Sequence, residues 1–208
     1  MEHRVVGSGQ LRADARDPEP DTRLRLFFAL ELPRDVRAAL GRLQTPAGAP
    51  GSGDYRWVQS ELLHVTLAFL GSQPSDALPR LREVAQSAAQ ASVRATLSLG
   101  DAGSFGAPRA PRVLWVGLRG NLAALTQLQA RLSTGLREAG FELEDRPFAP
   151  HVTLARRRPN ARPGTPLEWP PRARLPALPV PVQSFSLMRS ELSPAGPHYT
   201  TLERFALR

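Results

Sequence analysis

The first half of the chain alternates between apolar runs typical of strands and one-sided apolar patterns typical of helices. The run RLRLFFALELP predicts a buried strand over residues 23–32, which Pro33 ends. The segment that follows has apolar residues at the spacing of one helix face, at Val36, Ala39, Leu40 and Leu43. After a loop of Gly, Pro and Ser, the runs YRWV and LLHVTLAFLG predict two strands, the second ending at Gly71.

The same order of elements then begins again. The segment PSDALPRLREVAQSAAQA predicts a helix, VRATLSLGDAGSF predicts a strand, and RVLWVGL at residues 112–118 predicts the next strand. Asn121 is a candidate N-cap for a helix that ends before Gly140. One face of that helix is marked by Leu122, Leu125, Gln129, Leu132 and Leu136. The run FAPHVTLARRR predicts another strand, so the unit strand, helix, loop, strand occurs twice.

The two ends of the chain and one internal segment have other patterns. Residues 1–22 are polar and lack an apolar period, which predicts a flexible tail. Residues 159–181 are too rich in proline for a helix or a central strand, so we expect a long surface loop. The segments VPVQSFSLMRSEL and YTTLERFALR, joined by a turn at SPAGPH, predict a closing pair of strands.

A single offset relates the two units. The motif HVTL begins at His64 and again at His151, which are 151 − 64 = 87 positions apart. The same offset places Arg25, Leu26, Phe27 and Phe28 on Arg112, Val113, Leu114 and Trp115. Two copies of this length do not form a stacked array, and such copies commonly sit about a pseudo-twofold axis. We therefore expect one domain over residues 23–208, with an internal repeat around 24–71 and 111–158.

The composition narrows the possible chemistry. The chain is 41% hydrophobic and 22% charged, which is typical of a globular protein. It has no run of eighteen apolar residues and no signal segment, so we expect a cytoplasmic protein without a membrane partner. Cysteine is absent, which excludes disulfides and thiol nucleophiles. All 27 basic residues are arginine, a bias typical of a GC-rich bacterial genome, and without lysine there is no lysyl-nucleotide intermediate, Schiff base or P-loop. The net charge of +8 suits a polyanionic substrate.

The HVTL motifs present the same pair of polar side chains twice. In a strand, His64 and Thr66 point to one face while the aliphatic residues between them point to the other, and the same holds for His151 and Thr153. At neutral pH one of two imidazoles can be neutral and act as a base while the other is protonated and acts as an acid. Threonine hydroxyls can donate hydrogen bonds to phosphate oxygens. In-line displacement at phosphorus requires such a base and acid on opposite sides.

Alternative roles for the histidines stay open from the residues alone. A single histidine in a strand is more often structural than catalytic, but a repeated setting favours function. A metal site is a second alternative, because histidine is the commonest metal ligand. However, no Asp or Glu lies within two residues of either motif, and the spacing HxT is not chelating. His3 in the tail and His198 in a turn are expected to be bystanders.

At these residues the chain resembles the 2H phosphoesterases, and more narrowly the RNA 2′,3′-cyclic phosphodiesterases, also called 2′-5′ RNA ligases. The matching pieces are RLFFALELP, LLHVTLAFLG, RVLWVGL, FAPHVTLARRR and the C-terminal strand pair. The resemblance implies an α+β, bilobal pseudo-twofold fold with two antiparallel sheets lining a central cleft and helices outside. It also implies metal-independent hydrolysis of an RNA 2′,3′-cyclic phosphate to a 2′-phosphate, without cofactor or obligate protein partner. Because nothing in the sequence resembles a dedicated dimer helix, we expect a monomer. A weak reverse 2′-5′ ligation is an accompanying expectation.

The resemblance also implies roles for individual residues. His64 would be the proton donor and His151 the proton acceptor, although the near-symmetry of the sequence allows the reverse. Thr66 and Thr153 would hold the phosphate oxygens in the transition state.

Arg156 occupies a recurrent basic position of the family motif and is a candidate for substrate binding. Strict alternation would aim Arg157 into the cleft instead, so Arg156 requires a bulge or the end of the strand. Phe69 could stack on a nucleobase, but alternation places it on the core face. Trp57 and Tyr199 are further exposed-aromatic candidates.

Two competing functions remain open from the sequence. One is a phosphodiesterase acting on a small cyclic nucleotide. The other is a non-catalytic RNA-binding protein whose histidines only contact phosphate.

Overall fold

The structure is a computed structural model, and it describes residues 22–44, 52–107, 110–161, 169, 178–194 and 196–208. Except for Thr22, the predicted tail over residues 1–22 lies outside the described residues. The same is true of most of the proline-rich segment between residues 159 and 181. The tail therefore stays a prediction, and so does the loop over the undescribed part of the proline-rich segment.

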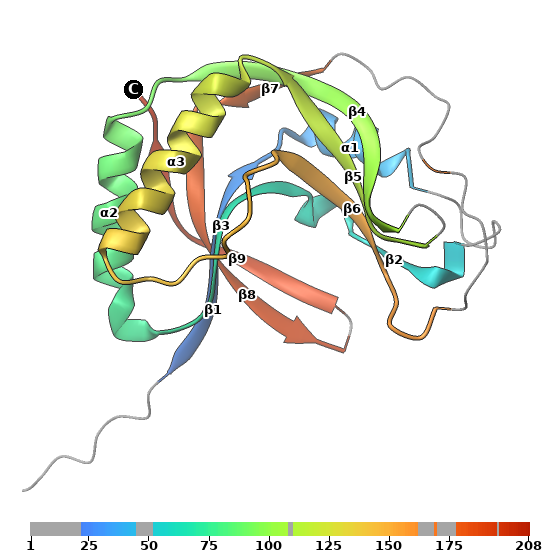
Figure 1. Cartoon of the computed structure of the whole chain (residues 1–208), viewed down its shortest axis with the longest axis horizontal. Coiled ribbons are helices and arrows are strands. Elements are labelled where there is room, and N and C mark those ends of the chain that lie inside the picture. Colours follow the sequence, from blue (N-terminus) through green and yellow to red (C-terminus); the bar gives the residue numbers. More distant parts are fainter. Residues whose placement is uncertain (1–21, 45–51, 108–109, 162–168, 170–177, 195) are drawn as a thin grey trace, which may run out of the picture.

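Within the described residues the chain forms nine strands and three α-helices (Figure 1). In chain order they are β1 (Arg23–Glu31), α1 (Arg34–Gly41), β2 (Tyr55–Trp57), β3 (His64–Pro74), α2 (Leu78–Gln90), β4 (Ala95–Ala107), β5 (Ala110–Gly120), α3 (Leu122–Glu138), β6 (His151–Arg157), β7 (Pro179–Val182), β8 (Ser184–Ser193) and β9 (Gly196–Ala206). The predicted helices and most of the predicted strands are present.

Three details differ from the sequence-based expectation. β3 continues past Gly71 to Pro74, because Gly71 adopts a positive φ of 68° inside the strand instead of ending it. The strand predicted around residues 180–192 is divided into β7 and β8, and β7 begins in the segment expected to be a loop. β7 pairs with β4 at the edge of the sheet, where proline is tolerated. His198 lies in β9 and not in a turn.

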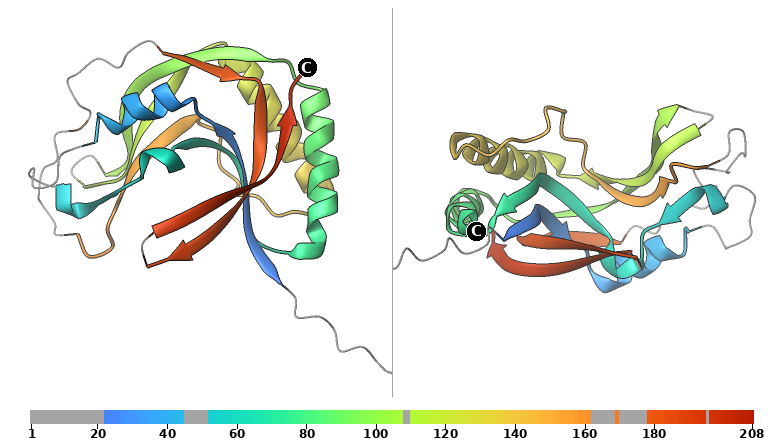
Figure 2. Two further views of the ribbon diagram at one scale, coloured as in Figure 1. Left: turned by 180° about the vertical axis from the view of Figure 1, so that it is seen from behind. Right: turned by 90° about the horizontal axis from the view of Figure 1, so that it is seen from below.

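The strands form two antiparallel halves, in agreement with the expected fold. The order is β7-β4-β5-β6 in one half and β3-β1-β8-β9 in the other, with β2 paired to β6. Figure 2 shows the two halves in its right-hand view, with β4 to β6 on one side and β1, β8 and β9 on the other. They are joined at one residue pair, Val65 with Val152. Because these valines are equivalent by the 87-residue offset, the pseudo-twofold axis passes between them.

The core fills the side of the sheet that faces α2 and α3. These helices lie side by side on one flank, as the two figures agree. α3 buries a stripe of leucines, Leu125, Leu128, Leu132 and Leu136, and the helical spacing of that stripe explains why this segment is a helix. Phe28 of β1 is fully buried and meets Phe185 edge to face at a centroid distance of 5.9 Å. On the opposite face of the central strands, Thr66 is exposed and His64 and His151 are half-buried.

Candidate active site

The two HVTL motifs begin the two central strands. His64 is the first residue of β3 and His151 is the first residue of β6. The strands run antiparallel, so the residues that flank the paired valines point to the same side of the sheet. Both histidines are half-buried, whereas Val65 and Val152 between the polar positions are fully buried. The fold thus brings both imidazoles and both threonines to one surface near the axis.

A bulge in β6 controls which arginine reaches this surface. Thr153 and Ala155 pair with consecutive residues of β5, so Leu154 has no partner of its own. The extra residue shifts the alternation by one position. Ala155 is therefore buried and Arg156 is exposed, on the same face as His151. The bulge that Arg156 needs in order to face the candidate site is therefore present.

β3 contains the same bulge, which overturns the expected position of Phe69. Thr66 and Ala68 pair with consecutive residues of β1, so Leu67 is the extra residue, at the position equivalent to Leu154. Phe69 then pairs with Phe27 on the face of Thr66. It joins a small apolar cluster there and is not part of the main core. Strict alternation, which placed Phe69 on the core face, was wrong because it assumed an unbroken ladder.

Both bulges are anchored by hydrogen bonds to the carbonyl groups that they free. The side-chain amide of Gln129 in α3 donates to the carbonyl oxygen of Leu67 at 3.3 Å. The backbone N–H of Val58 donates to the carbonyl oxygen of Leu154 at 2.8 Å. A buried carbonyl without a partner is costly, so these bonds stabilise the bulged geometry.

Backbone carbonyls orient the two imidazoles in the same way. Nδ1–H of His64 donates to the carbonyl of Leu62 at 2.7 Å, and Nδ1–H of His151 donates to the carbonyl of Ala149 at 2.6 Å. Because a carbonyl can only accept, the proton of the neutral ring lies on Nδ1 and Nε2 carries the lone pair. Nε2 of His64 lies 3.1 Å from Oγ1 of Thr66. Nε2 is therefore the atom on each ring that can take or give a proton.

Two aromatic rings flank each imidazole. They restrict the rotation of the imidazoles and exclude part of the solvent from them. The pairs and their centroid distances are Phe27–His64 at 5.1 Å, Tyr199–His64 at 5.5 Å, Phe105–His151 at 5.0 Å and Trp115–His151 at 6.3 Å. Of these, Phe27 and Trp115 lie in matched strands of the repeat, whereas Phe105 lies outside it. Only the pairing of β4 with β5 brings Phe105 to His151.

The surroundings lower the pKa of both histidines. Burial is the main cause, because it penalises the charged imidazolium, while the carbonyl hydrogen bonds oppose the effect. The positive charge of Arg156 lowers both pKa values further, and His151 also lowers that of His64. Burial raises the pKa of Tyr199, against the opposing influence of Arg156 and Arg25. Arg156 therefore acts electrostatically on both imidazoles and on Tyr199.

The remaining candidates lie in different surroundings. The guanidinium of Arg25 lies 4.7 Å over the ring of Phe69, which extends the surface away from the histidines. Arg157 pairs with Tyr55 of β2. Burial raises the pKa of that tyrosine, and the charge of Arg157 only partly opposes the rise. Trp57 was expected to be exposed, but it is half-buried and packs against Trp169 at a centroid distance of 6.3 Å.

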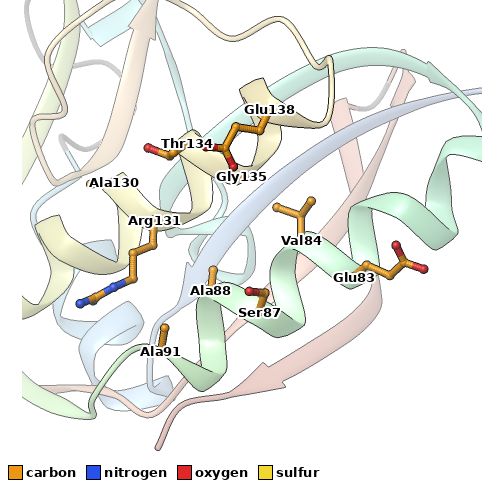
Figure 3. A pocket seen from close by; sticks show the side chains of 10 residues that line it. All are labelled: Glu83, Val84, Ser87, Ala88, Ala91, Ala130, Arg131, Thr134, Gly135 and Glu138. Carbon is orange, nitrogen blue, oxygen red and sulfur yellow. The ribbon is translucent and has the colours of Figure 1, made fainter.

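Of two cavities formed by the described residues, one touches this surface and the other does not. The smaller has a volume of about 300 Å³ and is lined by His151 together with Asp101, Phe105 and Trp115. The larger, about 610 Å³, lies between α2 and α3, and its walls are formed by small and charged side chains such as Ser87, Ala88 and Glu138 (Figure 3). Neither histidine lines the larger cavity, so the candidate site is the sheet surface.

Two further features concern the described residues only. They contain no group of three or more His, Cys, Asp or Glu side chains placed to hold a metal ion. None of their helices is both long and apolar enough to cross a membrane.

Comparisons with known proteins match this geometry. The family model of the 2′-5′ RNA ligase superfamily matches residues 32–194. The RNA 2′,3′-cyclic phosphodiesterase of Thermus thermophilus is 37% identical over 193 residues, which cover 89% of this chain and 91% of that protein. The enzyme of the same name in Escherichia coli K12 is 32% identical and covers 88% and 96%. The crystal structure of TT0787 of Thermus thermophilus superposes with a TM-score of 0.71 at 35% identity, covering 89% of this chain and 98% of that one.

Proposed function

The chain belongs to the 2′-5′ RNA ligase superfamily of 2H phosphoesterases, and from this membership we propose that it hydrolyses RNA 2′,3′-cyclic phosphate ends to 2′-phosphates. The observation that carries the proposal is the pair of HVTL strands that meet at Val65 and Val152. Their Nε2 atoms lie on one surface, each oriented by a carbonyl on Nδ1. A general acid and a general base related by this axis suit in-line displacement at phosphorus.

In the proposed reaction, Nε2 of His151 accepts a proton from water as the water oxygen attacks phosphorus. The bond between phosphorus and O3′ breaks, and O3′ takes a proton from Nε2 of His64. The product carries a 3′-hydroxyl and a 2′-phosphate, and the two histidines exchange protons with solvent before the next cycle. The assignment of His64 as acid and His151 as base follows the family pattern.

The other residues of the surface stabilise and position the phosphate. The hydroxyls of Thr66 and Thr153 donate to its non-bridging oxygens, where negative charge grows in the transition state. Arg156 adds a charge-assisted contact, and Phe69 supports the nucleobase by stacking. In the free protein Oγ1 of Thr66 lies 3.1 Å from Nε2 of His64. When substrate binds, the hydroxyl exchanges this contact for a hydrogen bond to the phosphate.

The lowered pKa values predict the pH dependence of the reaction. Activity of the free enzyme requires a protonated His64 and a neutral His151. The plot of kcat/KM against pH is therefore bell-shaped, and the two macroscopic pKa values set its two limbs. Since both values lie below the ordinary 6.5, the maximum of kcat/KM lies on the acid side of pH 6.5. A bound phosphate anion stabilises the imidazolium, so the maximum of kcat lies at a higher pH than that of kcat/KM.

The proposal includes weak reverse ligation, action as a cytoplasmic monomer and no need for a metal. Both histidines come from one chain, so a second copy is not required to complete the site. The named relatives favour RNA over a small cyclic nucleotide, which stays the alternative. A rate that rises with oligonucleotide length and falls with salt supports RNA, because several phosphate contacts make binding salt-sensitive.

The decisive experiment is cleavage of a short RNA that ends in a 2′,3′-cyclic phosphate, with EDTA present. Wild type should form the 2′-phosphate, and His64→Ala and His151→Ala should each lose roughly 10²- to 10⁴-fold in rate. His198→Ala is the matched control, since this exposed histidine lies in β9 opposite Glu191 and should retain full activity. Activity that is absent under EDTA and restored by a divalent metal would overturn the two-histidine mechanism.

A further inference from the structure

The proposed hydrolysis gives no role to the cavity beside His151. It is about 300 Å³ in volume, at the small end of the range for small-molecule sites, and large enough for one nucleobase. His151 forms part of its wall, so a group bound there lies next to the proposed general base of the reaction. Gly117 pairs with His151 in the sheet and has no side chain to fill this space.

The lining of the cavity combines an aromatic platform with a hydrogen-bond acceptor. Phe105 is one of the few large apolar residues at the surface of the described chain, with 39% of its area exposed. Its ring lies 5.2 Å from Trp115 and 5.0 Å from His151, centroid to centroid. Such a ring can stack on a base, which contributes on the order of tenfold in binding. Asp101 is the acidic residue of the lining, and a carboxylate can only accept hydrogen bonds.

The charge of the cavity selects the part of a nucleotide that it can hold. Among the described residues that line it, Asp101 is the one with a negative charge, in a chain whose net charge is +8. A carboxylate repels phosphate but accepts from the exocyclic amine of adenine or cytosine. Uracil has no such amine. The cavity therefore suits an uncharged, amine-bearing base and not a phosphate group.

In-line geometry places the cavity on the side of the attacking group. The attacking and leaving oxygens lie on opposite sides of phosphorus, and the leaving O3′ belongs to the nucleotide that carries the cyclic phosphate. That nucleotide therefore extends towards His64 and Phe69. The nucleoside of an attacking 5′-hydroxyl would lie on the other side, beside His151.

We propose that this cavity, formed by Asp101, Phe105 and Trp115 beside His151, binds the base of an acceptor nucleoside and directs its 5′-hydroxyl to the cyclic phosphate. This inference rests on the proposed function and on the assignment of His151 as base. His151 accepts the proton of the 5′-hydroxyl, the oxygen bonds to phosphorus, the bond to O3′ breaks, and His64 protonates O3′. The product is a 2′-5′ diester, and no cofactor is consumed.

The test measures how much of one cyclic-phosphate RNA reacts with water and how much reacts with an added acceptor. The acceptors are 2′,3′-dideoxyadenosine, 2′,3′-dideoxycytidine and 2′,3′-dideoxyuridine, whose single sugar hydroxyl is the 5′-hydroxyl. The ratio of 2′-5′ diester to 2′-phosphate is read by chromatography. Because both products come from the same bound donor, the ratio is insensitive to a general loss of catalytic rate.

We expect wild type to form more diester with the adenine and cytosine acceptors than with the uracil acceptor, by about tenfold for one hydrogen bond to a charged group. Asp101→Ala should abolish this preference. Phe105→Ala should lower the ratio for all three acceptors by roughly tenfold. Phe105→Leu keeps apolar bulk against Trp115 and His151 and should show the same loss, because only the stacking face is removed.

Phe69→Ala is the matched control in the other half of the molecule. It should lower both products together and leave their ratio unchanged, since Phe69 contacts the donor. A ratio that is unchanged in the Asp101 and Phe105 variants, or that falls in Phe69→Ala, would overturn the proposal. Hydrolysis without diester from any acceptor would also overturn it, together with the proposed reverse ligation, but leave the proposed hydrolysis intact, whereas the absence of hydrolysis would overturn both.

Discussion

Replacing Arg156 by glutamine tests the electrostatic arrangement of the site most directly. Arg156 is exposed on the face of His151, and its charge lowers the pKa of both histidines. Glutamine keeps a polar side chain of similar reach but removes the charge. Without that charge the imidazolium form of each ring is less disfavoured, so both pKa values rise. The maximum of kcat/KM should therefore move to a higher pH.

The loss of a phosphate contact sets the magnitude of the second effect. A hydrogen bond to a charged group contributes about 1.5–3 kcal/mol, which corresponds to roughly 10- to 150-fold in rate. Because Arg156 is exposed to solvent, water screens its charge and the lower end applies. We expect kcat/KM at the optimum to fall by about tenfold. The assay is hydrolysis of a cyclic-phosphate RNA under substrate-limited conditions across pH 4.5 to 8.

Two variants serve as controls for Arg156→Gln. Arg157→Gln makes the same chemical change one residue further on, beside Tyr55, and should leave the pH optimum in place. Arg156→Lys keeps the charge but not the planar fork, so it should retain the optimum and recover part of the rate. If the optimum of Arg156→Gln stays unchanged or moves to lower pH, the electrostatic argument is wrong. An equal shift in Arg157→Gln would refute the role of the bulge.

Three further predictions address the threonines, the histidines and the core. Thr153→Val removes one hydroxyl at constant shape and should lower kcat by roughly 10- to 10³-fold with little change in the melting temperature; a change in KM alone would contradict a transition-state role. His64 and His151 have lowered pKa values in the folded state, so their contribution to stability is present above pH 6.5 and is lost as the pH falls through 6.5 towards the folded-state values. Melting temperatures measured from pH 7.5 to 5 should therefore decline, and less so in a double glutamine variant; a rise on acidification contradicts the sign. Phe28→Ala should cost about 3–5 kcal/mol of unfolding free energy in urea denaturation, whereas Leu192→Ala, at a side chain that is 75% exposed, should change it by less than about 0.5 kcal/mol.

The position of the reacting groups could be predicted from the sequence because it depends on local rules. Alternation in a strand places His64 with Thr66 and His151 with Thr153 whatever the rest of the chain does. The 87-residue offset between the motifs indicates a symmetric arrangement, and the single pairing of Val65 with Val152 follows that symmetry.

Alternation failed at the fifth residue after each histidine, where tertiary contacts decide. The bulges at Leu67 and Leu154 are stabilised because α3 and the residue after β2 supply partners for the freed carbonyls, from Gln129 and Val58. Nothing within the strand's own sequence specifies those partners. The bulges carry Phe69 and Arg156 onto the site.

The sequence by itself thus determined the elements, the duplication and the pair of catalytic candidates, since periodicity and repetition are properties of neighbouring positions along the chain. Only the tertiary structure decided which side chains surround the two imidazoles. Phe105 and Tyr199 lie far from the HVTL motifs in sequence and reach the histidines through the pairing of β4 with β5 and of β8 with β9. The pKa values, which depend on burial and on charges across the sheet, could likewise emerge only after these strands had packed.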